Sequence, residues 1–349
     1  MLAALIGSRE VTSSGPIAFA GVHAHADERA VRGRGWTDAP TLDRMSLVPV
    51  EETITKALAR VPVLAGREVD VSVLAGGFTN SVFLVRADDE RYVFRVPGQS
   101  SDLLEINRAD ERYNAEIAAR AGASPDLVDY VEGMDVMVLE FIEGHVPTIE
   151  DLQTPDQVRR IAEAVRTLHG GPRFNNDADM FDRAKRWLEA CNKGSIRVPD
   201  GIDSRMGELD DIARALAANP LPTVPCHNDL APYNFIDDGD RLWIIDFEFS
   251  GNNDPCSDLG MIASEAELDV DLRTILCEAY FGDATPSLLA RIKLYAMLSN
   301  VGWSLYCAIQ AVVLSDESYR DEATGFWKSV VEALDSDEMP SMLRAVTGG

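Results

Sequence analysis

Two carboxylates and one carboxamide are spaced along the chain in a way that suits chemistry on a phosphate group. Asp229 and Asn234 share the segment 227–234, and Asp246 directly follows the apolar run 242–245. Asp229 can accept a proton from a hydroxyl group, while Asn234 and Asp246 can offer oxygen ligands to Mg²⁺ on a nucleoside triphosphate. A plain turn before a strand is the alternative, which the apolar strand between the carboxylates disfavours. We expect His227 to hold this loop by hydrogen bonds.

A glycine-rich connection earlier in the chain is the candidate for holding phosphate. Gly76 and Gly77 lie between two predicted strands and let the backbone approach phosphate oxygens closely, and Thr79 and Asn80 add short polar side chains. Two glycines in a hairpin are usually only a turn, so the neighbouring residues matter. Arg95, on the following predicted strand, can grip a phosphate through two hydrogen bonds.

Two acidic residues on the next predicted helix can pair with that arginine. Glu111 and Glu116 both lie within the segment 107–121, which has helical spacing. Without such a partner Arg95 would be an exposed strand residue, and Glu116 could equally be a solvated helix residue. The residues alone leave the choice between the two glutamates open.

A later helix carries a pair of aromatic side chains. Trp303 and Tyr306 are three residues apart and therefore share one helix face. Aromatic rings bind quaternary ammonium groups by cation–π attraction, yet two aromatics at this spacing more often belong to a core. Tyr319, Phe326 and Trp327 can complete a cage or simply pack.

The elements that must position these residues form a β-rich part followed by an α-rich part. Alternating and β-branched stretches predict strands at 69–74, 81–85, 91–96 and 134–142. Apolar spacing and capping residues predict helices at 107–121, 154–169, 179–190, 204–218, 256–281, 286–314 and 318–335. The sequence therefore predicts a flexible extension over residues 1–45, a nucleotide-binding lobe over 46–143, and a catalytic and substrate-binding lobe over 144–349.

Charge and composition narrow the partners. The 349-residue chain has a formal net charge of −26, which disfavours nucleic acids and anionic membranes and suits a cationic small molecule, although solubility alone is an alternative reason for the acidity. The five cysteines form no CxxC pair, which favours reduced thiols and a cytoplasmic location. The uncharged stretch 294–314 is long enough to cross a bilayer, but interrupting polar residues predict a buried helix and no membrane insertion.

Together these motifs resemble the choline/ethanolamine kinase family, in the aminoglycoside phosphotransferase-like branch of the protein-kinase-like fold. The resemblance extends over about residues 69–326 and rests on the segments 76–80, 94–98, 106–111, 227–234 and 245–251. Glu248, two residues after Asp246, is typical of the choline-kinase branch. Asp258 and Glu265 fit the family's downstream acidic positions. Tyr306 stands where the family usually has a second tryptophan.

The resemblance implies a two-lobed α+β fold, with a small β-rich N-terminal lobe, a large α-helical C-terminal lobe, and ATP and Mg²⁺ as cofactors. It makes Asp229 the catalytic base and assigns Mg²⁺ to Asn234 and Asp246, with all three residues catalytic. It favours Glu111 as the partner of Arg95. It assigns the nucleotide to Gly76, Gly77, Thr79, Asn80, Arg95, Glu111, Glu140 and Ile142. It assigns the acceptor to Asp229, Glu248, Glu265, Trp303 and Tyr306.

The predicted function is phosphorylation of the hydroxyl of a cationic amino alcohol by ATP, with choline or ethanolamine first. An aminoglycoside, a thiamine-like molecule or a sugar alcohol is the alternative acceptor, and a non-catalytic nucleotide-binding protein is a remote alternative. We expect a monomer or a homodimer without nucleic-acid partners. The sequence indicates no single acceptor and no role for residues 1–45.

Overall fold

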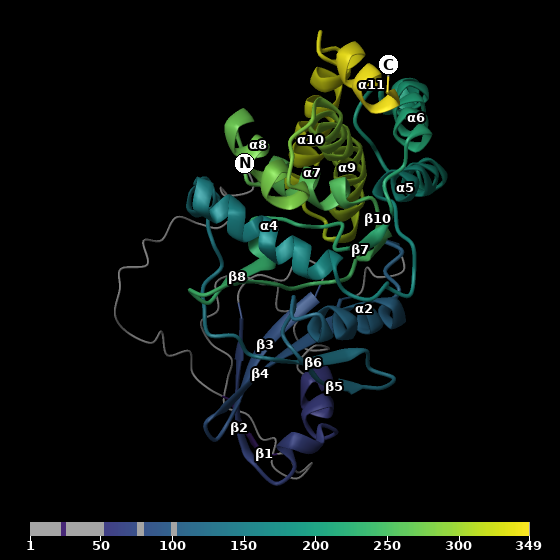
Figure 1. The fold of residues 1–349 in the computed structure, drawn as a ribbon. Coiled ribbons are helices and arrows are strands. Elements are labelled where there is room, and N and C mark those ends of the chain that lie inside the picture. Colours follow the sequence, from purple (N-terminus) through teal and green to yellow (C-terminus); the bar gives the residue numbers. More distant parts are fainter. Residues whose placement is uncertain (1–21, 26–51, 75–79, 99–102, 349) are drawn as a thin grey trace.

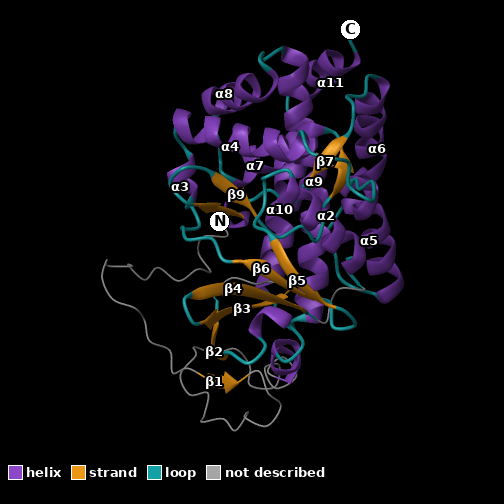
Figure 2. Ribbon diagram, turned by 60° about the horizontal axis from the view of Figure 1, so that its bottom comes forward, coloured by secondary structure: helices purple, strands orange, loops and turns teal. Residues whose placement is uncertain are grey.

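An antiparallel sheet and a larger helical body make up the protein (Figure 1). The structure, a computed structural model, describes residues 22–25, 52–74, 80–98 and 103–348. Figure 2 shows the sheet on one side and most of the helices on the other. The α+β fold predicted from the sequence is therefore confirmed.

Within the described residues the sheet has six strands in the order β1-β2-β3-β4-β6-β5, and every neighbouring pair is antiparallel. The strands are β1 (Val22–His25), β2 (Glu68–Val73), β3 (Asn80–Ala87), β4 (Glu90–Pro97), β5 (Leu127–Val131) and β6 (Val136–Glu140). Strands β3 and β4 form a hairpin, and its turn contains Asp88 with a φ of 53°. Val85 and Phe94 are fully buried in the core of this part, which fixes the register of the hairpin.

Helix α2 (Arg108–Arg120) joins the sheet to the helical body. Asn107 caps it, because its side chain accepts hydrogen bonds from the backbone N–H groups of Ala109 and Asp110. Glu111, in the first turn, is 2% exposed. The cap therefore starts the helix at the point that directs an acidic side chain inward.

The helical body is built around one long helix, α9 (Pro286–Val313), which packs against α5, α7, α10 and α11. The other helices are α3 (Ile149–Leu152), α4 (Pro155–His169), α5 (Met180–Gly194), α6 (Ile202–Ala218), α7 (Pro255–Glu265), α8 (Val270–Phe281), α10 (Ser318–Leu334) and α11 (Met339–Thr347). By length and composition α9 could cross a membrane, but 83% of its most apolar window is buried inside the protein. A core helix accounts for this stretch, as the sequence predicted.

Four short strands carry the loops that matter for chemistry. They are β7 (Val224–Cys226), β8 (Phe235–Asp237), β9 (Leu242–Ile244) and β10 (Gly251–Asn253). Strands β8 and β9 form one antiparallel pair, and β7 and β10 form another. The two pairs bring residues 227–234 and 245–250 together as neighbouring loops.

The predicted helix over residues 256–281 is wrong, because the chain forms two helices there. Helix α7 ends at Glu265, Glu267 has a φ of 49°, and Asp269 caps α8 by accepting a hydrogen bond from the backbone N–H of Leu272. A left-handed residue followed by an Asp cap ends one helix and starts the next. The sequence prediction also missed α3, β5, β7, β8, β10 and α11, as well as β1, which lies within the predicted flexible extension and pairs with β2.

Candidate active site

The loop after β7 is held in place by one buried carboxylate. Asp258, on α7, accepts the backbone N–H of His227 at 2.8 Å and the backbone N–H of Asn228 at 2.7 Å. Asn228 has a φ of 63°, a conformation that non-glycine residues seldom adopt. The two hydrogen bonds therefore stabilise a strained turn directly before Asp229.

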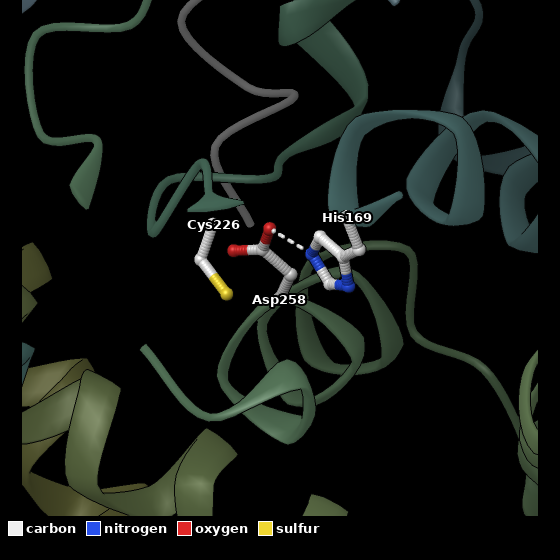
Figure 3. Close-up of side chains that lie close together, drawn as sticks. All are labelled: His169, Cys226 and Asp258. Carbon is white, nitrogen blue, oxygen red and sulfur yellow. Dashed lines mark hydrogen bonds and ion pairs between the residues drawn. The ribbon is translucent and has the colours of Figure 1, made fainter. Parts of the chain in front are cut away.

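His169, Cys226 and Asp258 lie close together in the interior (Figure 3). The Nε2 atom of His169 lies 2.9 Å from Asp258, and its Nδ1 atom lies 2.6 Å from the Tyr280 hydroxyl. Burial, together with nearby carboxylates, raises the pKa of Cys226 well above its usual value, so the thiol stays protonated. The Cys226 thiol lies 3.6 Å from the backbone oxygens of Asn253 and Asp254. Each of the three side chains therefore already has a partner, and we interpret the cluster as an anchor for the loop rather than a metal centre.

His227 has a structural place in this loop. Its Nε2 atom lies 2.8 Å from the backbone oxygen of Ile245, and its ring packs edge-on against Phe247 at a centroid distance of 4.9 Å. Burial lowers the pKa of His227, which favours the neutral ring. The residue thereby ties the loop of Asp229 to the loop of Asp246.

Asp229 and Asn234 lie side by side. The Asn234 side-chain N–H₂ donates to the backbone oxygen of Asp229 at 2.8 Å and to its Oδ2 atom at 3.2 Å, which leaves the amide oxygen of Asn234 for another ligand. Oδ1 of Asp229 is buried with no hydrogen-bond partner among the described residues. Burial, then the charges of Asp246 and Glu248, raises the pKa of Asp229 well above its usual value.

Arg95 links the sheet to the loop of Asp246. Its guanidinium forms ion pairs with Glu111 and Asp246, and with Glu248 at 3.1 Å. The structure thus pairs Arg95 with Glu111, whereas Glu116 pairs with Arg120 on the surface.

Two further contacts lie beside the ion pairs of Arg95, between the sheet and the helical body. Asn80 donates to Glu248 at 2.8 Å, and Arg108 donates to Glu111 at 2.7 Å. Glu248, predicted to contact the acceptor, therefore also holds the sheet against the helical body.

Asp246 follows β9 in a left-handed conformation, with a φ of 71°. Aspartate tolerates this region better than most residues, but it still needs support from its surroundings. The Asn234 amide oxygen and the Asp246 carboxylate line the same cavity and together form an all-oxygen donor set. Such a set fits Mg²⁺, which prefers oxygen ligands.

A cavity opens beside these residues, with about 690 Å³ of empty space that is partly open to solvent. Its lining residues are Asp229, Tyr233, Asn234, Asp246, Glu248, Phe249, Met261, Glu265, Trp303, Tyr306, Cys307, Tyr319, Glu322 and Phe326. Five of them are carboxylates and none is a lysine or an arginine. We call it the acceptor cavity. Its charge suits a cation.

An aromatic group forms one wall of the acceptor cavity. The rings of Trp303 and Tyr306 are 5.3 Å apart, and Phe249 lies 5.5 Å from Trp303 and 6.1 Å from Tyr306, all near edge-to-face. The Tyr306 hydroxyl accepts a hydrogen bond from Gln310 at 2.9 Å. The wall is therefore both apolar and held in a defined orientation.

The aromatic residues of helix α10 could either complete an aromatic cage or pack in the core, and the structure shows both outcomes. Tyr319 and Phe326 line the acceptor cavity, whereas Trp327 is buried elsewhere and donates to the backbone oxygen of Asp200 at 3.0 Å. Sequence reasoning missed Met261 and Glu322, which also line it. Only their position on folded helices reveals them, since neither belongs to a motif.

The remaining predicted nucleotide contacts lie away from this cavity or outside the described residues. Gly76, Gly77 and Thr79 fall in the undescribed segment 75–79. Glu140 ends β6, and Ile142 follows it, half-buried, in the connection from the sheet to the helical body.

Comparison with known proteins assigns the chain to a protein family. A model of the phosphotransferase enzyme family matches residues 70–295, more than half of the sequence. A solved structure of a choline/ethanolamine kinase family protein from Mesorhizobium loti matches with a TM-score of 0.72 and 33% identity, covering 85% of this chain and all of that one. The chain belongs to the choline/ethanolamine kinase family of phosphotransferases.

Two further relatives resemble this phosphotransferase. Protein LicA of Haemophilus influenzae is 28% identical over 247 residues, which cover 67% of this chain and 72% of that protein. Ethanolamine kinase 2 of Mus musculus is 24% identical over 326 residues, which cover 81% of this chain and 83% of that protein. As a member of this family, the protein is an enzyme that uses a nucleotide and transfers a phosphoryl group to a hydroxyl group of a small molecule.

Proposed function

We propose that the enzyme transfers the γ-phosphate of ATP to the hydroxyl of a cationic amino alcohol, with choline and ethanolamine as the first candidates. One observation carries the proposal. A single cavity contains Asp229, Asn234 and Asp246 as well as an anionic and aromatic wall that includes Glu265 and Trp303. The hydroxyl and the ammonium of one small molecule can therefore occupy the same space.

Asp229 is the proposed base. Its buried Oδ1 has no hydrogen-bond partner among the described residues, and so it can accept the hydrogen bond of an incoming hydroxyl. The raised pKa of Asp229 reflects burial beside other carboxylates and increases the basicity of the carboxylate. The hydrogen bond from Asn234 orients the carboxylate toward the acceptor.

Asn234 and Asp246 would hold Mg²⁺, which neutralises charge on the phosphates when it is bound. Arg95 would grip the phosphates after leaving Asp246, while Glu111 keeps the guanidinium in place. Gly76, Gly77, Thr79 and Asn80, together with Glu140 and Ile142 near the adenine, complete the proposed nucleotide site. We place the boundary between the two lobes at residue 143.

The acceptor's cationic group would lie against Trp303, Tyr306 and Glu265. An ammonium is attracted both by carboxylates and by aromatic faces. Glu322, on α10, adds a carboxylate that the motifs did not indicate. An uncharged sugar alcohol would gain nothing from this wall.

The test is release of ADP from Mg·ATP in the presence of choline, ethanolamine, thiamine, kanamycin or sorbitol. The proposal predicts the highest kcat/KM with choline or ethanolamine. Higher kcat/KM with kanamycin or sorbitol would move the acceptor to another class. ADP release that is the same with and without every acceptor would contradict the proposal.

A further inference from the structure

A second cavity lies among α7, α8, α9, α10 and α11, with about 940 Å³ of empty space that is partly open to solvent. Its polar lining includes Ser264, Arg273, Lys293, Asn300, Ser329 and Glu338. Ile292, Met297 and Met342 contribute apolar surface. We call it the rear cavity.

The rear cavity shares three helices with the acceptor cavity. Ser264, at the end of α7, precedes Glu265, and Asn300, on α9, lies one turn before Trp303. On α10, Ser329 lines the rear cavity and lies one turn after Phe326. The two cavities are therefore separate spaces beside the same helices.

Asn300, which lines the rear cavity, has a buried acceptor atom without a partner. Asn300 is 9% exposed, and its side-chain N–H₂ donates to the Ser329 hydroxyl at 3.1 Å. Ser329 donates its only hydroxyl proton to the backbone oxygen of Phe326 at 2.7 Å, so it can only accept from Asn300. This fixes the orientation of the amide. The Oδ1 atom of Asn300 is consequently buried with no hydrogen-bond partner among the described residues.

An arginine in the same cavity also has a buried nitrogen without a partner. Nε of Arg273 is buried and has no hydrogen-bond partner in the described part of the chain, and within that part the guanidinium forms no ion pair. The neighbouring Lys293, by contrast, pairs with Glu338 at 2.9 Å. The hydrogen bond and charge of Lys293, and more weakly the charge of Arg273, lower the pKa of Glu338, so Arg273 adds positive charge beside a carboxylate that Lys293 already pairs.

Buried polar atoms without partners are disfavoured, and native structures usually satisfy them. The guanidinium of Arg273 can donate hydrogen bonds to a ligand, and Oδ1 of Asn300 can accept one. Apolar side chains lie in the same cavity. We propose that the rear cavity binds a small hydroxycarboxylate, with its carboxylate on Arg273, its hydroxyl donating to Asn300 and its carbon chain against Ile292 and Met297.

The negative charge of such a ligand favours the rear cavity over the acceptor cavity. The five carboxylates of the acceptor cavity repel an anion. The variants of Asn300 and Arg273 then identify binding to the rear cavity, and the proposal is independent of the acceptor that the enzyme phosphorylates.

Calorimetric titration of the full-length enzyme with 3-hydroxybutyrate and with butyrate tests the proposal. We expect 3-hydroxybutyrate to bind about fivefold more tightly, since butyrate lacks the donor for Asn300. Asn300→Leu should remove this difference, and Arg273→Met should weaken both ligands by roughly tenfold, because it removes a charged hydrogen bond.

Arg344→Met, at an exposed position on α11 outside the cavity, is the matched control and should bind as the wild type does. Turnover with choline or ethanolamine shows that each variant is folded. No measurable binding to the wild type would overturn the proposal. Equal affinity for the two ligands in the wild type, or unchanged affinity in both cavity variants, would overturn it as well.

Discussion

Arg95, on the sheet, forms an ion pair with Asp246, in the helical body. The same guanidinium pairs with Glu111 and Glu248. One cation thus neutralises three acidic side chains that lie close together. It also engages the carboxylate that we assign to Mg²⁺, so nucleotide binding must exchange the partners of Arg95.

Arg95→Gln is expected to raise KM for ATP by roughly tenfold or more, because a charged, two-pronged phosphate contact is lost. Steady-state kinetics at saturating acceptor measure this. Arg91→Gln is the matched control, since Arg91 lies on the same strand but forms an exposed pair with Glu143. Equal changes in both variants would show that Arg95 has no special role with the nucleotide.

Asp229→Asn should lower kcat by about 10²- to 10⁴-fold and raise the melting temperature of the free enzyme. Burial and neighbouring carboxylates raise the pKa of Asp229 in the folded protein above its unfolded value. Its stabilising contribution is therefore lost as the pH rises, and the ionised side chain destabilises the fold at neutral pH. Activity assays and thermal melts at neutral pH check both effects.

Asp237→Asn provides the contrast. Asp237 is equally buried but accepts two hydrogen bonds from Arg160, at 2.6 and 2.7 Å, which lower the pKa of Asp237 to about 2. Its stabilising contribution is present above the ordinary pKa of an aspartate and is lost as the pH falls toward about 2. This variant should melt at a lower temperature than the wild type at neutral pH. A rise in both variants would refute the assignment of Asp229 as a carboxylate kept for function at a cost in stability.

Choline binding should strengthen as the pH rises through neutrality. Burial raises the pKa of Glu265 to about 7, so the side chain becomes a carboxylate near that pH. Choline keeps its own charge throughout, and calorimetry between about pH 6 and about pH 8 follows the change. In Glu265→Gln the dependence should be markedly flatter. A dependence as steep as that of the wild type would exclude Glu265 as its source.

Trp303→Leu should raise KM for choline by roughly tenfold, because it removes an aromatic face from the acceptor cavity. Trp327→Leu is the control, since Trp327 is also buried but does not line the acceptor cavity. Kinetics with choline as the varied substrate compare them. If the two variants shift KM alike, Trp303 acts only in packing.

Motifs made the local parts of this site predictable. Asp229 and Asn234 lie within one eight-residue motif, and Asp246 directly follows an apolar run that predicted β9, so these residues and the fold were predictable together. Arg95 and Glu111 are on adjacent elements, and their pairing followed from the resemblance. These residues could be predicted because they are close in sequence or belong to motifs with a regular spacing.

Other parts depend on how distant elements pack. Glu322 and Met261 reach the acceptor cavity because α7 and α10 both lie against α9, a contact that no spacing rule predicts. The break between α7 and α8 rests on Glu267, whose left-handed conformation has no clear sequence signal, although Asp269 was a usable cap signal. Tertiary packing therefore supplied what periodicity could not.

The central claim is that Asp229 drives phosphoryl transfer to an amino alcohol in the acceptor cavity. Its most direct test is the transfer of radiolabel from γ-labelled ATP to choline and to ethanolamine, with the products separated and with wild type and Asp229→Asn assayed side by side. The account predicts labelled phosphocholine or phosphoethanolamine from the wild type and a loss of about 10²-fold or more in the variant. Label on neither acceptor, or equal labelling by both proteins, would contradict it.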